Sequence, residues 1–302
     1  MVTVLALGAA LLYGSADFLG GSATRRAHVL CVLLVAGPAG MVVATLAALL
    51  AGGPPQAAGI AWGACAGLAG GVGFIFFYVG LAAGPMSVVA PVSALVSTVL
   101  PVAVALAEGE RPGAKVYLGA LICVVAIVLV STGGGEAAPE TAAAGADPGG
   151  PAVCPRPARH RTTIRGIGYG VAAGLAFGTF FLFIRNGGES GALWPVVAAR
   201  LSGTLVFLAA AAGIRTRTRP VSWRGDRRLF LAAVGAGVLD SSANICYVFA
   251  TRAGLFGLAV VLTSLYPGIT VLLARIVLGE RMRWPRRAGL ALAAVGIVLV
   301  TV

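Results

Sequence analysis

Charged side chains and histidine are scarce in this sequence. Only 11% of its 302 residues are charged, and it has two histidines. A soluble domain of this size would carry charged residues at about a quarter of its positions, because these form its hydrated surface. The shortage of charge, with a hydrophobic content of 59% and a mean hydropathy of +0.96, excludes an ordinary soluble fold. It indicates an integral membrane protein whose solvent is mostly lipid.

Residues that could bind metals or perform catalysis are also few. The five cysteines are scattered without a Cys-x-x-Cys pair, which argues against a disulfide framework or a zinc site. Both histidines, His28 and His160, fall between apolar runs, so we expect no histidine cluster within the membrane. A nucleotide-binding Gly-x-x-x-x-Gly-Lys-Ser/Thr loop is missing as well. We therefore expect no metal, no cofactor and no ATP-driven step within this chain.

The net charge of +12 comes almost entirely from arginine. The arginines gather in gaps between apolar runs, where the cytoplasmic flanks of membrane helices carry them. They therefore indicate topology and contact with anionic headgroups, and not nucleic-acid binding. The positive-inside rule then predicts a cytoplasmic linker between the halves of the chain and both termini outside. The basic segments on the predicted cytoplasmic side are 25–26, 156–165, 215–228 and 281–287.

An internal repeat is the strongest positive signal. The stretch from Ala83 to Thr132 aligns without a gap with the stretch that begins at Ala253–Gly254. A charged Gly-Glu-Arg break recurs between two apolar runs in both copies, at Gly109–Arg111 and Gly279–Arg281. A weaker similarity relates Leu11–Gly14 to Leu175–Gly178. Such a duplication predicts an architecture built from two related units.

Apolar runs long enough to cross a membrane follow one another along the chain. A helix rises 1.5 Å per residue, so a hydrocarbon core of about 30 Å requires about 20 apolar residues. On this basis we expect an all-α membrane protein with ten transmembrane helices, five in residues 1–132 and five in residues 165–302. Because five is odd, the second unit enters the membrane from the opposite side, which makes the repeats inverted. The expected spans are 3–22, 29–51, 58–82, 85–107, 114–132, 165–185, 192–214, 228–251, 254–278 and 284–302.

The two halves are joined by residues 133–164, which are rich in Gly, Ala and Pro. This segment has no periodic apolar pattern, so it cannot bury enough surface to offset the entropy of folding. We expect a disordered linker.

Glycines recur at every fourth position in two spans, from Gly59 to Gly71 and from Gly166 to Gly178. Residues spaced by four share one helix face, so each row of glycines predicts the close approach of a neighbouring helix.

Prolines interrupt two spans that correspond in the repeat. Pro91 and Pro101 lie in the fourth span, and Pro267 lies in the ninth. Each proline removes a backbone hydrogen bond, which is tolerated at membrane depth only against protein or a water-filled cavity. We expect helix breaks at these three positions, near the depth where repeat-built transporters bind their substrates. A packing kink without functional consequence is the alternative.

Ionisable residues within the spans are candidates for function, because a charge is costly in lipid. The main ones are Asp17, Arg200 and Asp240. Asp240 begins a polar stripe that continues at helical spacing through Asn244 and Tyr247, and lipid cannot satisfy these groups. Two interpretations remain open. The stripe is either an interhelical seam in which Asp240 pairs with Arg200, or the wall of a substrate cavity in which Asp240 carries a proton.

The corresponding face of the third span is aromatic. Phe74 and Phe77 align with Asn244 and Tyr247, and Tyr78 is adjacent. The repeat therefore predicts a pocket with an apolar aromatic wall and a polar wall, which suits a small amphipathic solute such as an amino acid. The candidate substrate-binding residues are Tyr13, Asp17, Phe74, Phe77, Tyr78, Asp240, Asn244, Tyr247 and Ser264.

In these features the chain resembles the EamA family of the drug/metabolite transporter superfamily. The resemblance spans both halves and implies a ten-helix inverted-repeat carrier of the cell membrane, with a central cavity, that often exports metabolites or amino acids. Members are commonly described with cytoplasmic termini, opposite to the topology that the charges predict. The residues that carry the resemblance are Leu12–Ser15, Tyr78, Gly80–Leu81, Ala83–Gly84, the two Gly-Glu-Arg breaks, Gly119 and Gly289.

We therefore expect a secondary-active transporter, and not an enzyme, that exports a small organic metabolite. Proton coupling is the expected energy source. A flippase for lipid or an undecaprenyl-type carrier is one alternative. A membrane-embedded enzyme is another, but it requires more clustered catalytic groups than Asp17 and Asp240 supply.

Overall fold

The computed structural model describes residues 1–24, 26–83, 86–111, 113–132, 159–188, 193–213, 227–278 and 284–301. Within these ranges the chain forms eleven helices and no strands. The predicted all-α class is therefore confirmed for the described part of the chain. The helices are α1 (Val2–Thr24), α2 (Val29–Ala51), α3 (Ala57–Ala83), α4 (Met86–Ala107), α5 (Ala114–Thr132), α6 (Arg159–Gly188), α7 (Trp194–Gly213), α8 (Arg227–Arg252), α9 (Phe256–Thr263), α10 (Tyr266–Leu278) and α11 (Trp284–Thr301).

Length and hydropathy show that this is a multi-pass membrane protein. Among the described residues, seven helical segments are long and apolar enough to cross a membrane: α1, α2, α3, α6, α7, α8, and α9 taken together with α10. The remaining expected spans correspond to α4, α5 and α11, whose described apolar segments are shorter. Large apolar side chains such as Leu50 and Ile276 are exposed on the outside of the bundle, where lipid would cover them.

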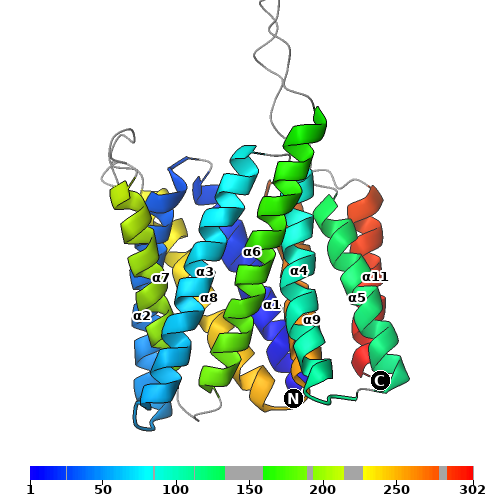
Figure 1. The fold of residues 1–302 in the computed structure, drawn as a ribbon, viewed down its shortest axis with the longest axis horizontal. Helices are drawn as coiled ribbons and strands as arrows, with labels where there is room; N and C mark the ends of the chain where they lie inside the picture. Colours follow the sequence, from blue (N-terminus) through cyan, green and yellow to red (C-terminus); the bar gives the residue numbers. More distant parts are fainter. Residues whose placement is uncertain are drawn as a thin grey trace, which may run out of the picture.

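The long helices run side by side in one bundle (Figure 1). The N-terminus of α1 and the end of α11 lie at the same end of the bundle, and the start of α6 projects from the opposite end (Figure 1). Val2 accordingly lies against Gly254, in the turn between α8 and α9. We call this the terminal end of the bundle.

Helices from the two halves of the chain intermix. α3 packs against α6 and α7, while α8 packs against α1 and α2. α4 lies against α6, α5 against α11, and α1 also contacts α9 and α10. Consecutive helices such as α1 and α2 contact each other much less. The core is therefore built between the halves more than within them.

Glycine makes the closest of these contacts possible. A Cβ atom at Gly63 or Gly67 of α3 would overlap backbone carbonyl oxygens of α7. A Cβ atom at Gly237 of α8 would likewise overlap the carbonyl oxygen of Ala36 of α2. Backbones that approach this closely gain van der Waals contact, which drives helix association in lipid.

The start of α6 differs from the expected boundary. Residues 133–158 of the predicted linker lie outside the described residues, but residues 159–164 are helical and belong to α6. The sequence placed the boundary at Arg165 because the apolar run begins there. Hydropathy indicates where a helix enters lipid, whereas the helix itself can extend into the aqueous phase.

The prolines act differently in the two related spans. The ninth span is divided into α9 and α10, and Pro267 lies in the first turn of α10, where a missing N–H is tolerated. α4, in contrast, continues without a break through Pro91 and Pro101, which corrects the expectation for these two residues. Pro101 is buried and its ring lies beside Gly178 of α6. Tight packing of this kind can hold a helix together where one hydrogen bond is lost.

Candidate functional site

Polar and aromatic side chains meet where α1, α6, α7, α8 and α10 converge. α1 and α8 pack along each other, and α7 and α10 reach the same region through the ion pair and ring contacts described below. We call these side chains the central cluster. Its members are Tyr13, Asp17, Phe181, Arg200, Asp240, Asn244, Tyr247 and Tyr266.

The central cluster contains three charged side chains from three helices. Nη1 of Arg200 on α7 forms an ion pair with Oδ2 of Asp240 on α8. Their side chains are 18% and 35% exposed, so the pair is only partly hydrated. Asp17 on α1 lies close enough to Asp240 for the two carboxylates to interact electrostatically. A partly buried charge pair attracts more strongly than one in water, but it also loses hydration.

Aromatic rings from four helices surround these charges. The ring of Phe181 on α6 stands edge-on to Tyr13 on α1, with centroids 6.3 Å apart, and lies 5.0 Å from Tyr247 on α8. Tyr266 on α10 completes the row at 6.0 Å from Tyr13. Edge-on and tilted rings at these distances attract one another. The rings therefore form a continuous wall that fixes the helices around the charges.

Several buried polar atoms of this region have no hydrogen-bond partner. In the central cluster they are the hydroxyl of Tyr13 and Oδ1 of Asn244, and the hydroxyl of Ser241, which lies against Gly40 of α2, also lacks a partner. Tyr13 is 8% exposed and Asn244 is 2% exposed. Nδ2 of Asn244 donates to the carbonyl of Asp240 at 2.8 Å, which holds the amide beside the charges. An unsatisfied buried polar atom costs about 1–3 kcal/mol, so such atoms indicate a place for a ligand or water.

Two of the sequence-predicted aromatic residues lie elsewhere. Phe74 and Phe77 on α3 contact Phe177 on α6, with ring centroids 5.1 and 6.3 Å apart, and Phe74 also contacts Phe207 on α7. These four rings form a second group, which we call the aromatic cluster. The packing of α3 against α6 and α7 places this group next to the central cluster, since Phe177 and Phe181 lie one turn apart on α6.

The remaining predicted residues take separate positions. Tyr78 lies in α3, but its side chain is outside the described residues. Ser264 is buried between α9 and α10, where its N–H donates to the carbonyl of Val260 at 2.9 Å. Tyr13, Asp17, Asp240, Asn244 and Tyr247 are the candidates that come together.

The sequence reasoning did not select Phe181 or Tyr266. The sequence did contain a signal for Phe181. When Leu11–Gly14 is aligned with Leu175–Gly178, Phe181 falls at the position that corresponds to Asp17. Tyr266 directly precedes Pro267 at the division between α9 and α10. A residue next to a helix break in a repeat-built membrane protein is a candidate for substrate contact.

A second polar group lies at the terminal end of the bundle. Nη1 of Arg185, at the end of α6, lies 2.6 Å from Oε2 of Glu108, and its guanidinium covers the ring of Phe256 at 4.3 Å. Glu110 accepts hydrogen bonds from the N–H groups of Phe256 and Gly257, at 2.6 and 3.0 Å. These contacts join the connection between α4 and α5 to α6 and α9.

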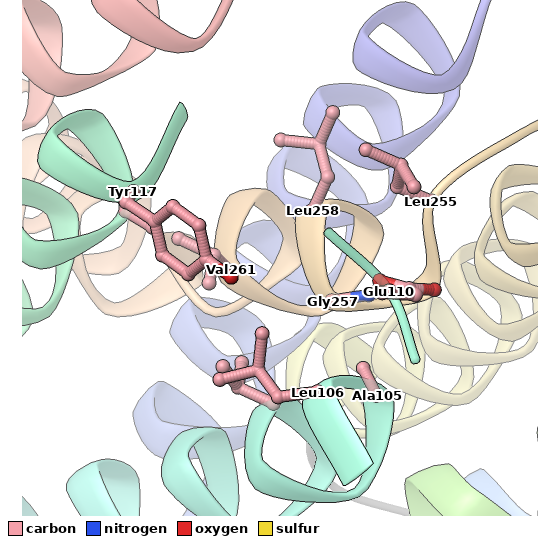
Figure 2. Close-up of a pocket in the computed structure, with 10 residues that line it drawn as sticks. Ala105, Leu106, Glu110, Tyr117, Leu255, Gly257, Leu258 and Val261 are labelled. Carbon is pink, nitrogen blue, oxygen red and sulfur yellow. Dashed lines mark hydrogen bonds between the residues drawn. The ribbon is translucent and has the colours of Figure 1, made fainter. Parts of the chain in front are cut away.

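A small pocket lies beside Glu110, between α4, α5 and α9. Figure 2 shows the Glu110 carboxylate next to Gly257, with Leu106, Leu258 and Tyr117 around the hollow. Its volume of about 60 Å³ is enough for a few water molecules and too small for an amino acid. Its lining is almost entirely apolar, and the polar side-chain groups among its lining residues are the Glu110 carboxylate and the Tyr117 hydroxyl.

The fold, the central cluster and the polar group around Arg185 together define a multi-pass, helical membrane protein with charged side chains between its helices. A family model described as the EamA-like transporter family matches residues 1–132 and 164–302, and the chain belongs to this family. The resemblance seen in the sequence is therefore confirmed. A search of curated proteins finds no match.

Solved structures share the fold. Matches extend to 23 chains. One of them, described only as a crystal structure of a protein, is 21% identical and has a TM-score of 0.72. The comparison covers 100% of this chain and 98% of the other. At this level of identity the likeness establishes a common fold and carries no information about the transported solute.

Proposed function

We propose that this protein is a secondary-active transporter of the cell membrane that exports a small organic metabolite, such as an amino acid, by alternating access. The observation that carries the proposal is the central cluster. Charged side chains and unpartnered buried polar atoms meet there at the junction of helices from both halves. Membrane proteins retain such costly groups at depth chiefly where a substrate or ion passes.

The proposed architecture is ten transmembrane helices in two inverted repeats, residues 1–132 and 165–302. Its support is a packing pattern that is preserved when the halves are exchanged. α3 packs on α6 and α7, and the corresponding α8 packs on α1 and α2. The pattern extends to single glycines: Gly203 lies against Gly67 between α7 and α3, and Gly40 lies against Gly237 between α2 and α8. Inverted repeats in transporters place the substrate between the repeats.

Exchanging the two halves of the chain also relates residues of the central cluster to residues of the aromatic cluster. Asn244 and Tyr247 align with Phe74 and Phe77, and Tyr13 aligns with Phe177. One set of positions therefore carries polar groups and the other carries benzene rings. A solute with a charged end and an apolar side chain matches both surfaces.

Alternating access requires that each end of the bundle close in turn. The contacts of Arg185 with Glu108 and Phe256 support a state that is closed at the terminal end. The distribution of arginine predicts that this end faces outward. The state described here is then closed to the outside, which is the state that would load a solute for export.

Transport is tested in two steps. Metabolite levels of cells with and without the gene identify the solute, and flux of that solute is then measured in proteoliposomes. We expect Asp240→Asn and Asn244→Ala to reduce flux by about tenfold or more. The first leaves the Arg200 guanidinium without its counterion, and the second removes an unpartnered amide oxygen that can bond a polar group of the solute. Leu205→Ala is the matched control, since Leu205 on α7 is 54% exposed on the lipid side.

The outcomes separate the alternatives. Normal flux in both site variants would remove the central cluster as the binding site. Movement of labelled phospholipid without flux of a soluble metabolite would favour a flippase. Chemical conversion of the metabolite in sealed vesicles would favour an enzyme.

A further inference from the structure

We propose that Asp17 binds the positively charged group of the transported solute, while Arg200 and Asp240 form a fixed neutral pair beside it. The solute is then an amine or a zwitterion whose ammonium group occupies a subsite on α1. This inference deepens the proposed function and rests on it.

The charges of the central cluster do not cancel one another. The central cluster holds two carboxylates, Asp17 and Asp240, and one guanidinium. The guanidinium of Arg200 is in contact with Asp240. Among the described residues, Asp17 has no basic partner and its charged neighbour is Asp240. Two carboxylates at membrane depth with one cation leave one negative charge that a monovalent cation would neutralise.

Aromatic side chains lie near the Asp17 carboxylate. Tyr13 precedes it by one helical turn on the same face of α1, and Tyr266 of α10 interacts with it electrostatically. Phe181 lies against Tyr13. Aromatic faces attract ammonium groups, so a carboxylate beside such rings adds a second attraction for the same group. The unpartnered hydroxyl of Tyr13, which is 8% exposed, supplies a hydrogen-bonding group at the same place.

The Asp17 side chain is accessible, unlike the residues that precede it on the same face of α1. Ala6, Ala10, Tyr13 and Asp17 lie on one face of α1 at helical spacing. The first three are buried, whereas Asp17 is exposed, as is Gly21 one turn further on. The inward face of α1 thus opens at Asp17, toward the end of the bundle opposite Arg185 and Glu108. A solute that enters from that end would find the Asp17 side chain exposed.

The other carboxylate is less suitable for this role. Asp240 has its guanidinium partner, and its carbonyl accepts a hydrogen bond from Asn244. Binding an ammonium group there requires separation of an existing ion pair, whereas binding at Asp17 requires no such step. The charged and titratable groups that face Asp17 are Asp240 of α8, Tyr266 of α10 and Tyr13 of α1 itself.

The test uses the purified full-length chain and three probes that share a phenyl ring and differ in charge: 2-phenylethylamine, phenylalanine and 3-phenylpropionate. Binding is measured by calorimetry and by the thermal unfolding shift at constant pH. We expect the amine and the zwitterion to bind and the carboxylate alone to bind at least tenfold more weakly. Asp17→Asn should weaken binding of the amine by about 30-fold or more, as expected when the ammonium group loses its charge partner.

Two further variants control for folding and helix position. Asp17→Glu keeps the charge and should keep the preference for the amine, so it remains informative if Asp17→Asn is unstable. Ser15→Ala should leave binding unchanged, because the Ser15 hydroxyl donates only to the Leu11 carbonyl of its own helix. Equal binding of all three probes, no binding of any, or wild-type affinity for the amine in Asp17→Asn would each overturn the proposal.

Flux separates this inference from the proposed function. If proteoliposomes move the identified solute and Asp17→Asn moves it as fast, the ammonium subsite is wrong and transport stands. If the amine binds through Asp17 but no solute crosses the membrane, the subsite stands and transport is wrong.

Discussion

Replacing Arg200 with glutamine tests whether the ion pair of the central cluster is a coupled unit. The substitution leaves Asp240 without its cation next to Asp17, another carboxylate. Loss of one partner costs about 3–5 kcal/mol for a fully buried pair and up to about 1 kcal/mol for an exposed pair. Since the side chains of Arg200 and Asp240 are 18% and 35% exposed, we expect an intermediate loss of about 2 kcal/mol.

The assay is a double-mutant cycle with Arg200→Gln, Asp240→Asn and the double variant, measured as unfolding free energy in detergent. The double variant removes both charges, so it should lose at least about 1 kcal/mol less than the sum of the single losses. Arg228→Gln is the control. Arg228 is exposed at the start of α8, and its loss should cost less than about 0.5 kcal/mol. Additive losses, within about 0.5 kcal/mol, would refute the reasoning.

Three other substitutions test separate parts of the structure. Tyr13→Phe removes a buried hydroxyl that has no partner, so we expect a thermal stability equal to or above wild type, with weaker solute binding by calorimetry. Gly237→Val would overlap the Ala36 carbonyl and should lower the unfolding free energy by about 2 kcal/mol or more, whereas Gly8→Val, with open space around it, should not. Glu110→Ala removes the acceptor of two N–H groups at the start of α9 and should cost about 1 kcal/mol, measured as a lower midpoint of thermal unfolding. An unchanged midpoint in Glu110→Ala would show that these bonds are replaced by water.

The sequence predicted the helices well because lipid imposes a simple rule. A span of about 20 apolar residues has few alternatives to a helix, since its backbone groups find no partner in hydrocarbon. The same cost identifies charged residues that must face the interior, and Arg200 and Asp240 do face each other. The sequence left this pair as one of two open interpretations of the polar stripe, and the structure shows the contact between the two side chains.

The arrangement of the aromatic residues was not predictable by the same reasoning. The repeat shows that Phe74 and Phe77 correspond to Asn244 and Tyr247. Correspondence indicates equivalent positions related by symmetry, and equivalent positions need not touch. α6 contacts both sets of residues, so Phe177 meets the aromatic rings of α3 while Phe181 meets the tyrosines of the central cluster. Helix contacts between the halves, which hydropathy does not encode, decided this outcome.

Local chemistry also failed to predict the behaviour of proline. Pro101 lies within a continuous α4, and Pro267 lies next to a division of the chain into α9 and α10. Gly178 of α6 allows close packing against Pro101, which holds α4 together where one backbone hydrogen bond is lost. Pro267 lies in the first turn of α10, where no hydrogen bond within that helix is lost.

If the two halves are the inverted repeats that we propose, the differences between them explain how a symmetric scaffold binds an asymmetric solute. Tyr13 and Asp17 on α1 align with Phe177 and Phe181 on α6, so two polar positions in one half are phenyl rings in the other. If both halves had kept the polar residues, the site would hold two equivalent anionic subsites and a solute would bind in either direction. With one anionic side and one aromatic side, the proposed ammonium group at Asp17 fixes the orientation of the solute. Its apolar part then points toward the aromatic cluster around Phe177, which is the geometry that allows one solute to be distinguished from another by its side chain.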